Sequence, residues 1–587
     1  MTRIVPVWIG LAALVALPGA ESASTEDAKL TAYFKAHLER EFQERPLEAT
    51  RLGDHRFDAE LDDVSARARA RWIERYRTVL AGLRKAVDYA KLSRDAQIDL
   101  EIFEHDLKYR LWEAENTRPF EDDPRTYNGY LTDSVYLLFT QSTLDRARNV
   151  RNAAARIDRL GQILTAARAS LKTPARALTE TAIRQNRGAI SFYENGIYEL
   201  SGENPTTSAL KGPCTRAVAM LREYQEFLEK TLLPRSTGEW RLGYERFASK
   251  MPMELNAGKT ANEVLAEAER EFDRVRSEMY VIARQLWHRI HKGHALPPDD
   301  AAGRHETITR VLEVLNREHG KAEELISEAK TWSEKLKRFI AERDILRLPE
   351  PDRCKIVEMP EFQRGYSVAY LNPAPPLDPK ASSYYAISPP PEGWDARRKQ
   401  SFLEEYNRYL MQMLTIHEAY PGHYVQLEYS NRHPSFIRRV LQSGVFAEGW
   451  AVYTEQMMLD QGYGDGDLAL RLNQLKWYLR AVANAILDHK MHCKNMSDEA
   501  AMELLVKQAF QSEGEAVGKI LRAKQQSCQL STYFVGRMAF YHLRQAVQRE
   551  QGAAFQLGRF HEAVLSHGTL PVRYLPELVR VRLRSPR

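Results

Sequence analysis

Cysteine is scarce in this sequence and is never clustered. The 587 residues include only Cys214, Cys354, Cys493 and Cys528, and no two of them have C-x-x-C spacing. This spacing argues against a cysteine-ligated metal cluster. In an oxidising compartment four cysteines allow three disulfide pairings, and free buried thiols are the alternative. The spacing does not decide between the two.

Three other features are missing. There is no dense block of Lys and Arg, and the formal net charge of +5 is small for this length, so we expect no nucleic-acid partner. Beyond the N-terminus no segment is apolar enough to span a bilayer, so we expect no stable membrane insertion of the mature chain. No repeat of 20–50 residues is evident, which argues against a solenoid. With 43% hydrophobic and 28% charged residues, the composition is that of a globular protein.

The first 23 residues have the layout of a secretory signal. Arg3 is followed by an apolar run that begins at Ile4, and small residues precede residue 24. A membrane anchor is the alternative, but the run is short of the roughly 20 residues a span needs and contains Pro6 and Pro18. No cysteine lies near the cleavage zone, so a lipid anchor is not indicated. We expect cleavage after the signal and a periplasmic or secreted protein.

Helical periodicity dominates what is present. Apolar residues three and four apart, with few glycines, predict helices over 26–45, 65–117, 145–199, 206–232, 258–291, 303–345 and, with breaks, 397–582. Short β-branched and aromatic runs between residues 354 and 388 predict a few strands. The fold class is therefore mainly α with a small β-sheet. The simplest division is an N-terminal helical lobe (24–340) and a C-terminal lobe (341–587) with the sheet and the motif described next.

That motif is "HEAYPGH", residues 417–423. A helix that ends at Pro-Gly is common, and a single histidine near a helix end is usually structural. That interpretation does not explain why His417, Glu418 and His423 occur together. In metallohydrolases a neutral imidazole binds the metal, and a neighbouring carboxylate takes a proton from the bound water. The motif therefore predicts His417 and His423 as ligands and Glu418 as the general base.

The spacing of the two histidines is unusual. On a regular helix, residues six apart lie about 120° apart around the axis and cannot reach one ion. Pro421 cannot donate a hydrogen bond to the His417 carbonyl, and Gly422 tolerates backbone angles that other residues avoid. We therefore predict a widened or broken helix that turns His423 back toward His417.

A catalytic zinc site needs a third protein ligand. In "FAEGWAVYTEQMM", Glu448 precedes Gly449, which leaves room for another helix to approach closely. This arrangement resembles glutamate-type zincins, so we expect Glu448 to be the third ligand of a single Zn²⁺. A carboxylate that stabilises a helix N-terminus is the alternative. Glu455 lies two turns further on the same face and is the second choice, or a partner for one of the histidines.

Other segments extend a resemblance to a known family. The chain is similar to the bacterial family called domain of unknown function 885, whose members are regarded as zincin-type zinc peptidases with an H-E-x-x-P-G-H motif. The similar segments are "RPLEATRLGDHRFDAELDDVS" (45–65), "EGWAVYTEQ", "LRAVANAILDHKMHCKNMSDEAA" (479–501), "STYFVGRMAFYHLR" and "FHEAVLSHGTLP". The resemblance implies a two-lobed helical body around a deep cleft, and it implies the same metal ligands and general base.

Peptide hydrolysis also needs groups that hold the developing oxyanion and the substrate. The resemblance raises several residues at helical spacing to candidates. The candidate catalytic residues are Tyr533 and His492, and Asp488 lies one turn from His492, where it could orient the ring. The candidate substrate-binding residues are Arg480, Arg537 and Tyr385. For each, an ordinary structural contact is the alternative. Tyr385 belongs to "SSYYAIS", a segment we expect to be an edge strand that pairs with substrate.

The leading functional expectation is an exported zinc peptidase that hydrolyses short peptides. The alternatives are a non-peptidase metal-dependent amide hydrolase, a non-haem iron enzyme with a two-His, one-carboxylate site, and a catalytically silent peptide-binding protein. The iron alternative gives Glu418 no purpose, and such sites normally occupy β-barrels.

Overall fold

Helices form most of the molecule, as the sequence predicts, and the only sheet among the described residues is small. The computed structural model describes residues 25–359, 368–391 and 393–584. The predicted signal segment, residues 1–23, lies outside these ranges. Within them, no helix is long and apolar enough to cross a bilayer. All four cysteines are described, and none of them forms a disulfide in this structure.

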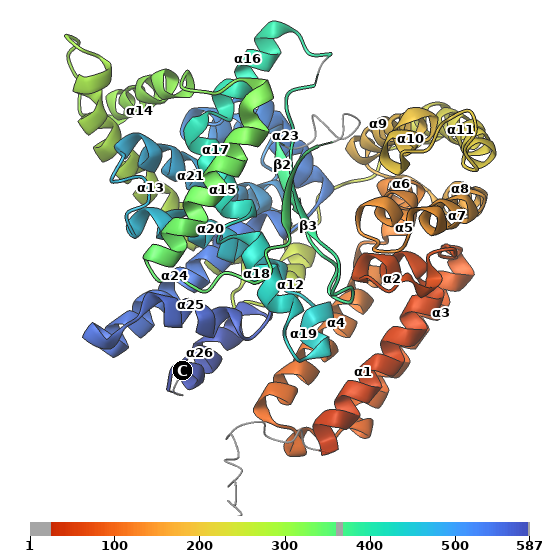
Figure 1. The fold of residues 1–587 in the computed structure, drawn as a ribbon. Coiled ribbons are helices and arrows are strands. Elements are labelled where there is room, and N and C mark those ends of the chain that lie inside the picture. The colour runs from red at the N-terminus through yellow and green to blue at the C-terminus, as the bar shows by residue number, and fades with distance from the viewer. Residues whose placement is uncertain (1–24, 360–367, 392, 585–587) are drawn as a thin grey trace, which may run out of the picture.

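The first group of helices lies on one side of the strands and is coloured red to yellow in Figure 1. Polar caps such as Ser65, Ser93 and Asp145 accept hydrogen bonds from the first turns of their helices and fix where those helices begin. The group consists of α1 (Thr25–Glu44), α2 (Pro46–Leu52), α3 (Ala66–Ala86), α4 (Arg94–Asn116), α5 (Pro119–Asp122), α6 (Arg125–Thr140), α7 (Arg146–Ile157), α8 (Leu160–Ser170), α9 (Arg176–Ser191), α10 (Ile197–Ser201) and α11 (Lys211–Glu226).

The second group lies on the other side of the strands (Figure 1). It consists of α12 (Tyr244–Leu255), α13 (Ala261–Ile290), α14 (Ala301–Asn316), α15 (Leu325–Glu342), α16 (Ala396–Glu405), α17 (Arg408–Glu418), α18 (His423–Asn431), α19 (Phe436–Val440), α20 (Gly444–Asp460), α21 (Leu468–Cys493), α22 (Asp498–Met502), α23 (Glu513–Gln525), α24 (Thr532–Gln551), α25 (Leu557–Leu565) and α26 (Leu575–Arg584).

The predicted boundary near residue 340 does not separate these groups. Helix α13 lies along α21, where the Tyr478 hydroxyl donates to Glu271 at 2.9 Å and Lys490 pairs with Glu269 at 2.7 Å. Helix α15 packs on α17. The second group therefore begins with α12, which starts at Tyr244. The change of composition at residue 346 lies about 100 residues later in the sequence. The strands, which caused that change, are an insertion within the second group.

The sheet has the order β1-β3-β2, with β1 (Cys354–Glu358) parallel and β2 (Ala369–Asn372) antiparallel to β3 (Ser383–Ile387). The expectation that "SSYYAIS" is an edge strand is therefore wrong, because β3 is central. The edge strand nearest the motif is β2, which contacts α17. Strand β2 also contacts α6, where the hydroxyls of Tyr136 and Tyr370 lie 3.4 Å apart, and the amide of Gln141, just after α6, donates to Asn372 at 2.6 Å. The sheet thus lies between the two groups of helices (Figure 1).

Candidate metal centre

The "HEAYPGH" segment breaks the helix as its sequence predicts. Helix α17 ends at Glu418 and α18 begins at His423. Between them the N–H of Gly422 donates to the Ile416 carbonyl at 3.0 Å. This bond joins residues six apart, whereas a bond of a regular α-helix joins residues four apart. A Cβ on Gly422 would lie 1.9 Å from the His417 carbonyl oxygen, so only glycine allows this close approach. The Pro421 carbonyl accepts a hydrogen bond from the Trp450 indole at 2.8 Å, which ties the break to α20.

The break brings the two imidazoles together. Their ring centroids lie 4.8 Å apart, with the planes nearly perpendicular. Oε2 of Glu448 lies 3.4 Å from Nε2 of His423 and 3.7 Å from Nε2 of His417. One donor atom from each of these residues lies within 4.8 Å of the others, and this is the only such group of His, Cys, Asp or Glu side chains in the described part of the chain.

These distances suit a zinc ion. Tetrahedral bonds of 2.0–2.1 Å to His nitrogen and carboxylate oxygen place neighbouring donor atoms about 3.4 Å apart. Oε2 of Glu448 is also buried and accepts no hydrogen bond from the described residues. A buried carboxylate oxygen without a donor is costly, and a cation would satisfy it. The donor set and its spacing therefore fit the predicted ion.

Glu455 orients the first histidine. Its Oε1 lies 2.7 Å from Nδ1 of His417 and accepts a hydrogen bond from the Trp477 indole at 3.0 Å. The Glu455 side chain is fully buried. An imidazole that donates through Nδ1 has its lone pair on Nε2, the atom that faces Glu448. Glu455 thus occupies the position of a partner for His417 rather than of a ligand.

The charges of the cluster reinforce one another. Burial lowers the pKa of His417, but Glu448 and Glu455 outweigh burial and raise that pKa well above its usual value. Burial raises the pKa of Glu448, and the two histidines outweigh burial and lower it. In the metal-free site these charges favour an ionised Glu448 and a protonated His417, so a cation that binds here would displace the imidazole proton.

A close helix crossing positions Glu448. Gly449 on α20 meets Gly536 on α24, and a Cβ on Gly449 would lie only 2.3 Å from the Gly536 Cα atom. The two backbones can approach this closely only because both residues lack a side chain. The Trp450 side chain that follows is fully buried. Glu448 is thus fixed by the packing of the residues that follow it.

Glu418, Tyr533 and Arg480 line one cavity of about 360 Å³, and His417 is the member of the cluster that lines it with them. Oε2 of Glu418 accepts a hydrogen bond from the backbone N–H of Leu371 on β2 at 2.9 Å. Burial and the charge of Glu448 raise the pKa of Tyr533 to about 12, so this phenol is a proton donor at neutral pH. The structure thus brings together six of the residues predicted for the site: the three candidate ligands, Glu418, Tyr533 and Arg480.

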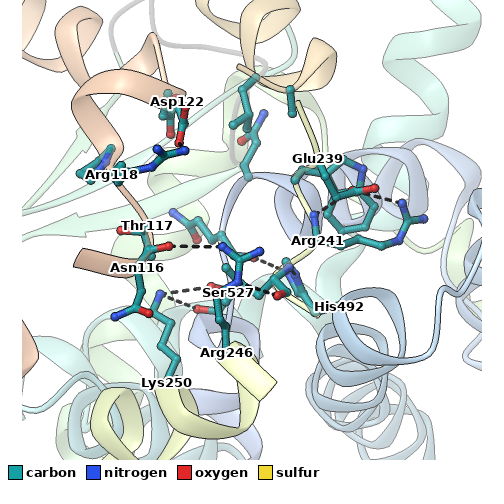
Figure 2. Close-up of a pocket in the computed structure, with 18 of the residues that line it drawn as sticks. Asn116, Thr117, Arg118, Asp122, Glu239, Arg241, Arg246, Lys250, His492 and Ser527 are labelled. Carbon is teal, nitrogen blue, oxygen red and sulfur yellow. Dashed lines mark hydrogen bonds and ion pairs between the residues drawn. The ribbon is translucent and has the colours of Figure 1, made fainter. Parts of the chain in front are cut away.

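His492 does not belong to this cavity. It lines a different cavity of about 560 Å³, shown in Figure 2, where Lys250 and Ser527 form a hydrogen bond at 3.1 Å. Nε2 of His492 donates to the Ala523 carbonyl at 2.9 Å, and its ring stacks on Phe247. Burial lowers its pKa to about 4. The structure therefore does not place His492 beside the metal centre, and its ring connects backbone segments instead.

Three further predictions fail for the same reason, that the side chain packs inside the protein. Asp488 does not orient His492; it accepts hydrogen bonds from the Cys528 N–H at 3.0 Å and the Ser531 hydroxyl at 2.9 Å. The substrate-binding roles fail for Arg537 and Tyr385. Arg537 is buried between the rings of Tyr478 and Tyr541 and donates to Gln456 at 2.6 Å. Tyr385 is fully buried and its hydroxyl lies 3.3 Å from that of Thr415.

Sequence reasoning also missed residues that line the cavity, above all Asn484 on α21 and Lys519 and Arg522 on α23. A signal for the last two was present. Gly514 and Gly518 lie four apart on the face of α23 that carries Lys519 and Arg522, and glycine is unfavourable inside a helix. A Cβ on either glycine would meet nothing within 4 Å, so these positions leave the helix face open.

Comparison with known proteins agrees on the fold and leaves the chemistry open. A structure described as that "of a putative lipoprotein of unknown function from Shewanella oneidensis" has a TM-score of 0.79 and 29% identity, over 94% of this chain and 99% of that one. A "putative lipoprotein from Colwellia psychrerythraea" has a TM-score of 0.77 and 17% identity, over 95% and 99%. No curated protein matches. A family profile described as "Bacterial protein of unknown function (DUF885)" matches residues 46–579. The chain therefore belongs to the DUF885 family, as the motif and its flanking segments predict.

Proposed function

We propose that this chain is an exported zinc-dependent peptidase that hydrolyses short peptides. The observation that carries the proposal is that His417, which belongs to the cluster with His423 and Glu448, lines the same cavity as Glu418 and Tyr533. Export is supported by the signal-like N-terminus and by the lipoprotein names of the two structural neighbours.

Each residue has a chemical task that follows from its position. His417, His423 and Glu448 would hold one zinc ion, which supplies Lewis-acid polarisation of a carbonyl and an acidified water. The Leu371 N–H fixes one oxygen of Glu418 and leaves the other for proton transfer. Glu418 takes a proton as the water oxygen adds to the peptide carbonyl, and it passes that proton to the amine as the C–N bond breaks. The Tyr533 O–H donates to the oxyanion that forms.

The cavity limits the substrate. A volume of about 360 Å³ is near the small end of ligand pockets, which span roughly 300–1,000 Å³. Such a space accepts a few residues of an extended peptide and excludes a folded domain. Strand β2 forms one wall through Ala369, and Glu418 contacts its outer edge. We infer that substrates are short or unfolded peptides.

The test is the pair of variants Glu418→Gln and Glu428→Gln. Glu428 is a buried carboxylate on α18 that pairs with Arg432 at 3.2 Å outside the cavity, so it is a matched control. We expect both variants to hold one zinc per chain by elemental analysis. Mass spectrometry of peptide-library digests should show cleavage by wild type and Glu428→Gln, abolished by a chelator, and none by Glu418→Gln. Full activity of Glu418→Gln, iron in place of zinc, or zinc without any cleavage would contradict the proposal.

A further inference from the structure

Three basic side chains line the cavity, Arg480 on α21 and Lys519 and Arg522 on α23; we call this set the cationic wall. Arg480 pairs with Glu515, which also lines the cavity. Lys519 has no ion pair or hydrogen bond within the described ranges. Arg522 donates only to neutral groups, Gln529 at 2.8 Å and Tyr533 at 3.1 Å. Lys519 and Arg522 therefore form no ion pair with a carboxylate in the part of the chain that the structure describes.

Two residues that line this part of the cavity, Arg480 and Asn484, each have a buried polar atom without a partner. Nη1 of Arg480 is buried and has no hydrogen-bond partner among the described residues. Oδ1 of Asn484 is also buried without a hydrogen-bond partner among the described residues. Asn484 is only 4% exposed and lines the cavity one turn from Arg480. Leaving buried polar atoms without partners is unfavourable, so a wall with several of them is built for a ligand.

The electrostatics point to an anionic ligand. Burial and the neighbouring Arg480 and Arg522 charges lower the pKa of Lys519 well below its usual value, and the opposite effect of the Glu448 charge is smaller, so like charges have been brought together at a cost. An anion placed between them would remove that repulsion. Arg and Lys are the side chains that bind carboxylates through charge-assisted hydrogen bonds. A peptide offers such a group at its C-terminus and on Asp or Glu side chains.

We propose that the cationic wall binds a carboxylate of the substrate next to the scissile bond, with the C-terminal carboxylate as the expected source, so that the enzyme removes residues from free C-termini. The inference rests on the proposed function. It follows from the size of the cavity, because the wall and His417 share about 360 Å³ and an extended residue spans about 3.3–3.6 Å. A carboxylate on Lys519 and Arg522 thus lies one or two residues from the metal centre.

Binding separates this inference from the catalytic proposal. The zinc-loaded Glu418→Gln protein would be titrated calorimetrically with N-acetyl-tetra-alanine, with its C-terminal amide, and with the amide of N-acetyl-Ala-Ala-Ala-Glu. We expect the free acid to bind about 10- to 100-fold more tightly than the tetra-alanine amide, the range for loss of a charge-assisted hydrogen bond. If only the amide of the Glu peptide binds tightly, the wall binds the carboxylate of an acidic side chain. That result would keep the carboxylate site and reject the C-terminus as its source. Equal binding of all three peptides would overturn the inference.

Variants of the wall identify its role. Lys519→Met and Arg522→Gln, each added to Glu418→Gln, should bring the acid-over-amide ratio close to one. Lys524→Met is the matched control, because Lys524 lies on the same helix, pairs with Asp498 at 2.5 Å and lines the other cavity. If Lys519 and Arg522 only position Tyr533 or the helix, both peptides will lose affinity equally and the inference fails. Selective binding with no turnover by wild type would instead reject the peptidase and keep the carboxylate site.

Discussion

The crossing of α20 and α24 makes a quantitative prediction through Gly449→Ala. The added methyl group would lie 2.3 Å from the Gly536 Cα and 2.8 Å from the Arg537 nitrogen, both backbone atoms that cannot rotate away. Ordinary contact begins near 3.4 Å, so the helices must separate by about 1 Å at this point. Glu448 precedes Gly449 and would move with the backbone.

The size of two effects follows from this displacement. Overpacking of a close contact costs about 1–3 kcal/mol of the free energy of unfolding. A shift of about 1 Å in a ligand also loosens the metal centre, where changes around the ligands typically lower metal affinity about 10- to 100-fold. Gly449→Ala should therefore destabilise the metal-free protein and weaken zinc binding together.

Gly444→Ala is the control. Gly444 begins the same helix, and a Cβ there would meet nothing within 4 Å, so we expect no loss of stability and a gain of about 0.5–1 kcal/mol at most. Urea unfolding of chelator-treated protein measures stability, and titration against a chromophoric zinc chelator measures affinity. If Gly449→Ala matches Gly444→Ala in both measurements, the close crossing does not hold Glu448 and our account of the site is wrong.

Four shorter predictions test other residues. Glu455→Ala should lower zinc affinity about 10- to 100-fold in the same titration, because His417 loses its orienting partner; unchanged affinity would remove that role. Tyr533→Phe should lower kcat by at least about a hundredfold with little change in KM, and a wild-type kcat would discard the oxyanion role. Burial raises the pKa of Asp488 to about 7, so the native protein binds this proton more tightly than the unfolded chain does. The free energy of unfolding should therefore fall as pH rises from about 4 to 7, by at most about 4 kcal/mol. Asp488→Asn should remove that fall when urea unfolding is measured across this pH range. His492→Gln should lower the melting temperature and leave kcat/KM of the folded protein unchanged, whereas loss of turnover without loss of stability would restore its catalytic role.

The motif could be predicted because its chemistry is local. Pro421 and Gly422 dictate a break within six residues of His417, and no distant contact is needed to see that His423 must turn back. The helices were predicted for a similar reason, since the period of apolar residues records which face is buried. Glu448 could be predicted because Gly449 leaves room for another helix, but the sequence does not show that the helix which approaches is α24.

The sequence did not reveal which other helix or cavity each helix face packs against. Tyr533 and Arg537 lie one turn apart on α24, yet one lines the cavity and the other packs between tyrosines. The lobe boundary was misplaced because strands mark a change of composition and not a change of packing partner. Lys519 escaped notice because a lysine on an amphipathic helix normally faces water, and only the fold shows that this face is enclosed.

Trp477 contacts both Glu455, which orients His417, and Arg480 of the cationic wall. Its indole nitrogen holds Glu455, and its ring lies 4.9 Å beneath the Arg480 guanidinium. One rigid side chain is therefore shared between the support of the first histidine and the wall that would select substrates. Any change that tilts this ring would therefore act on both the proposed metal centre and the proposed carboxylate-binding wall, so we expect metal affinity and substrate selectivity to change together.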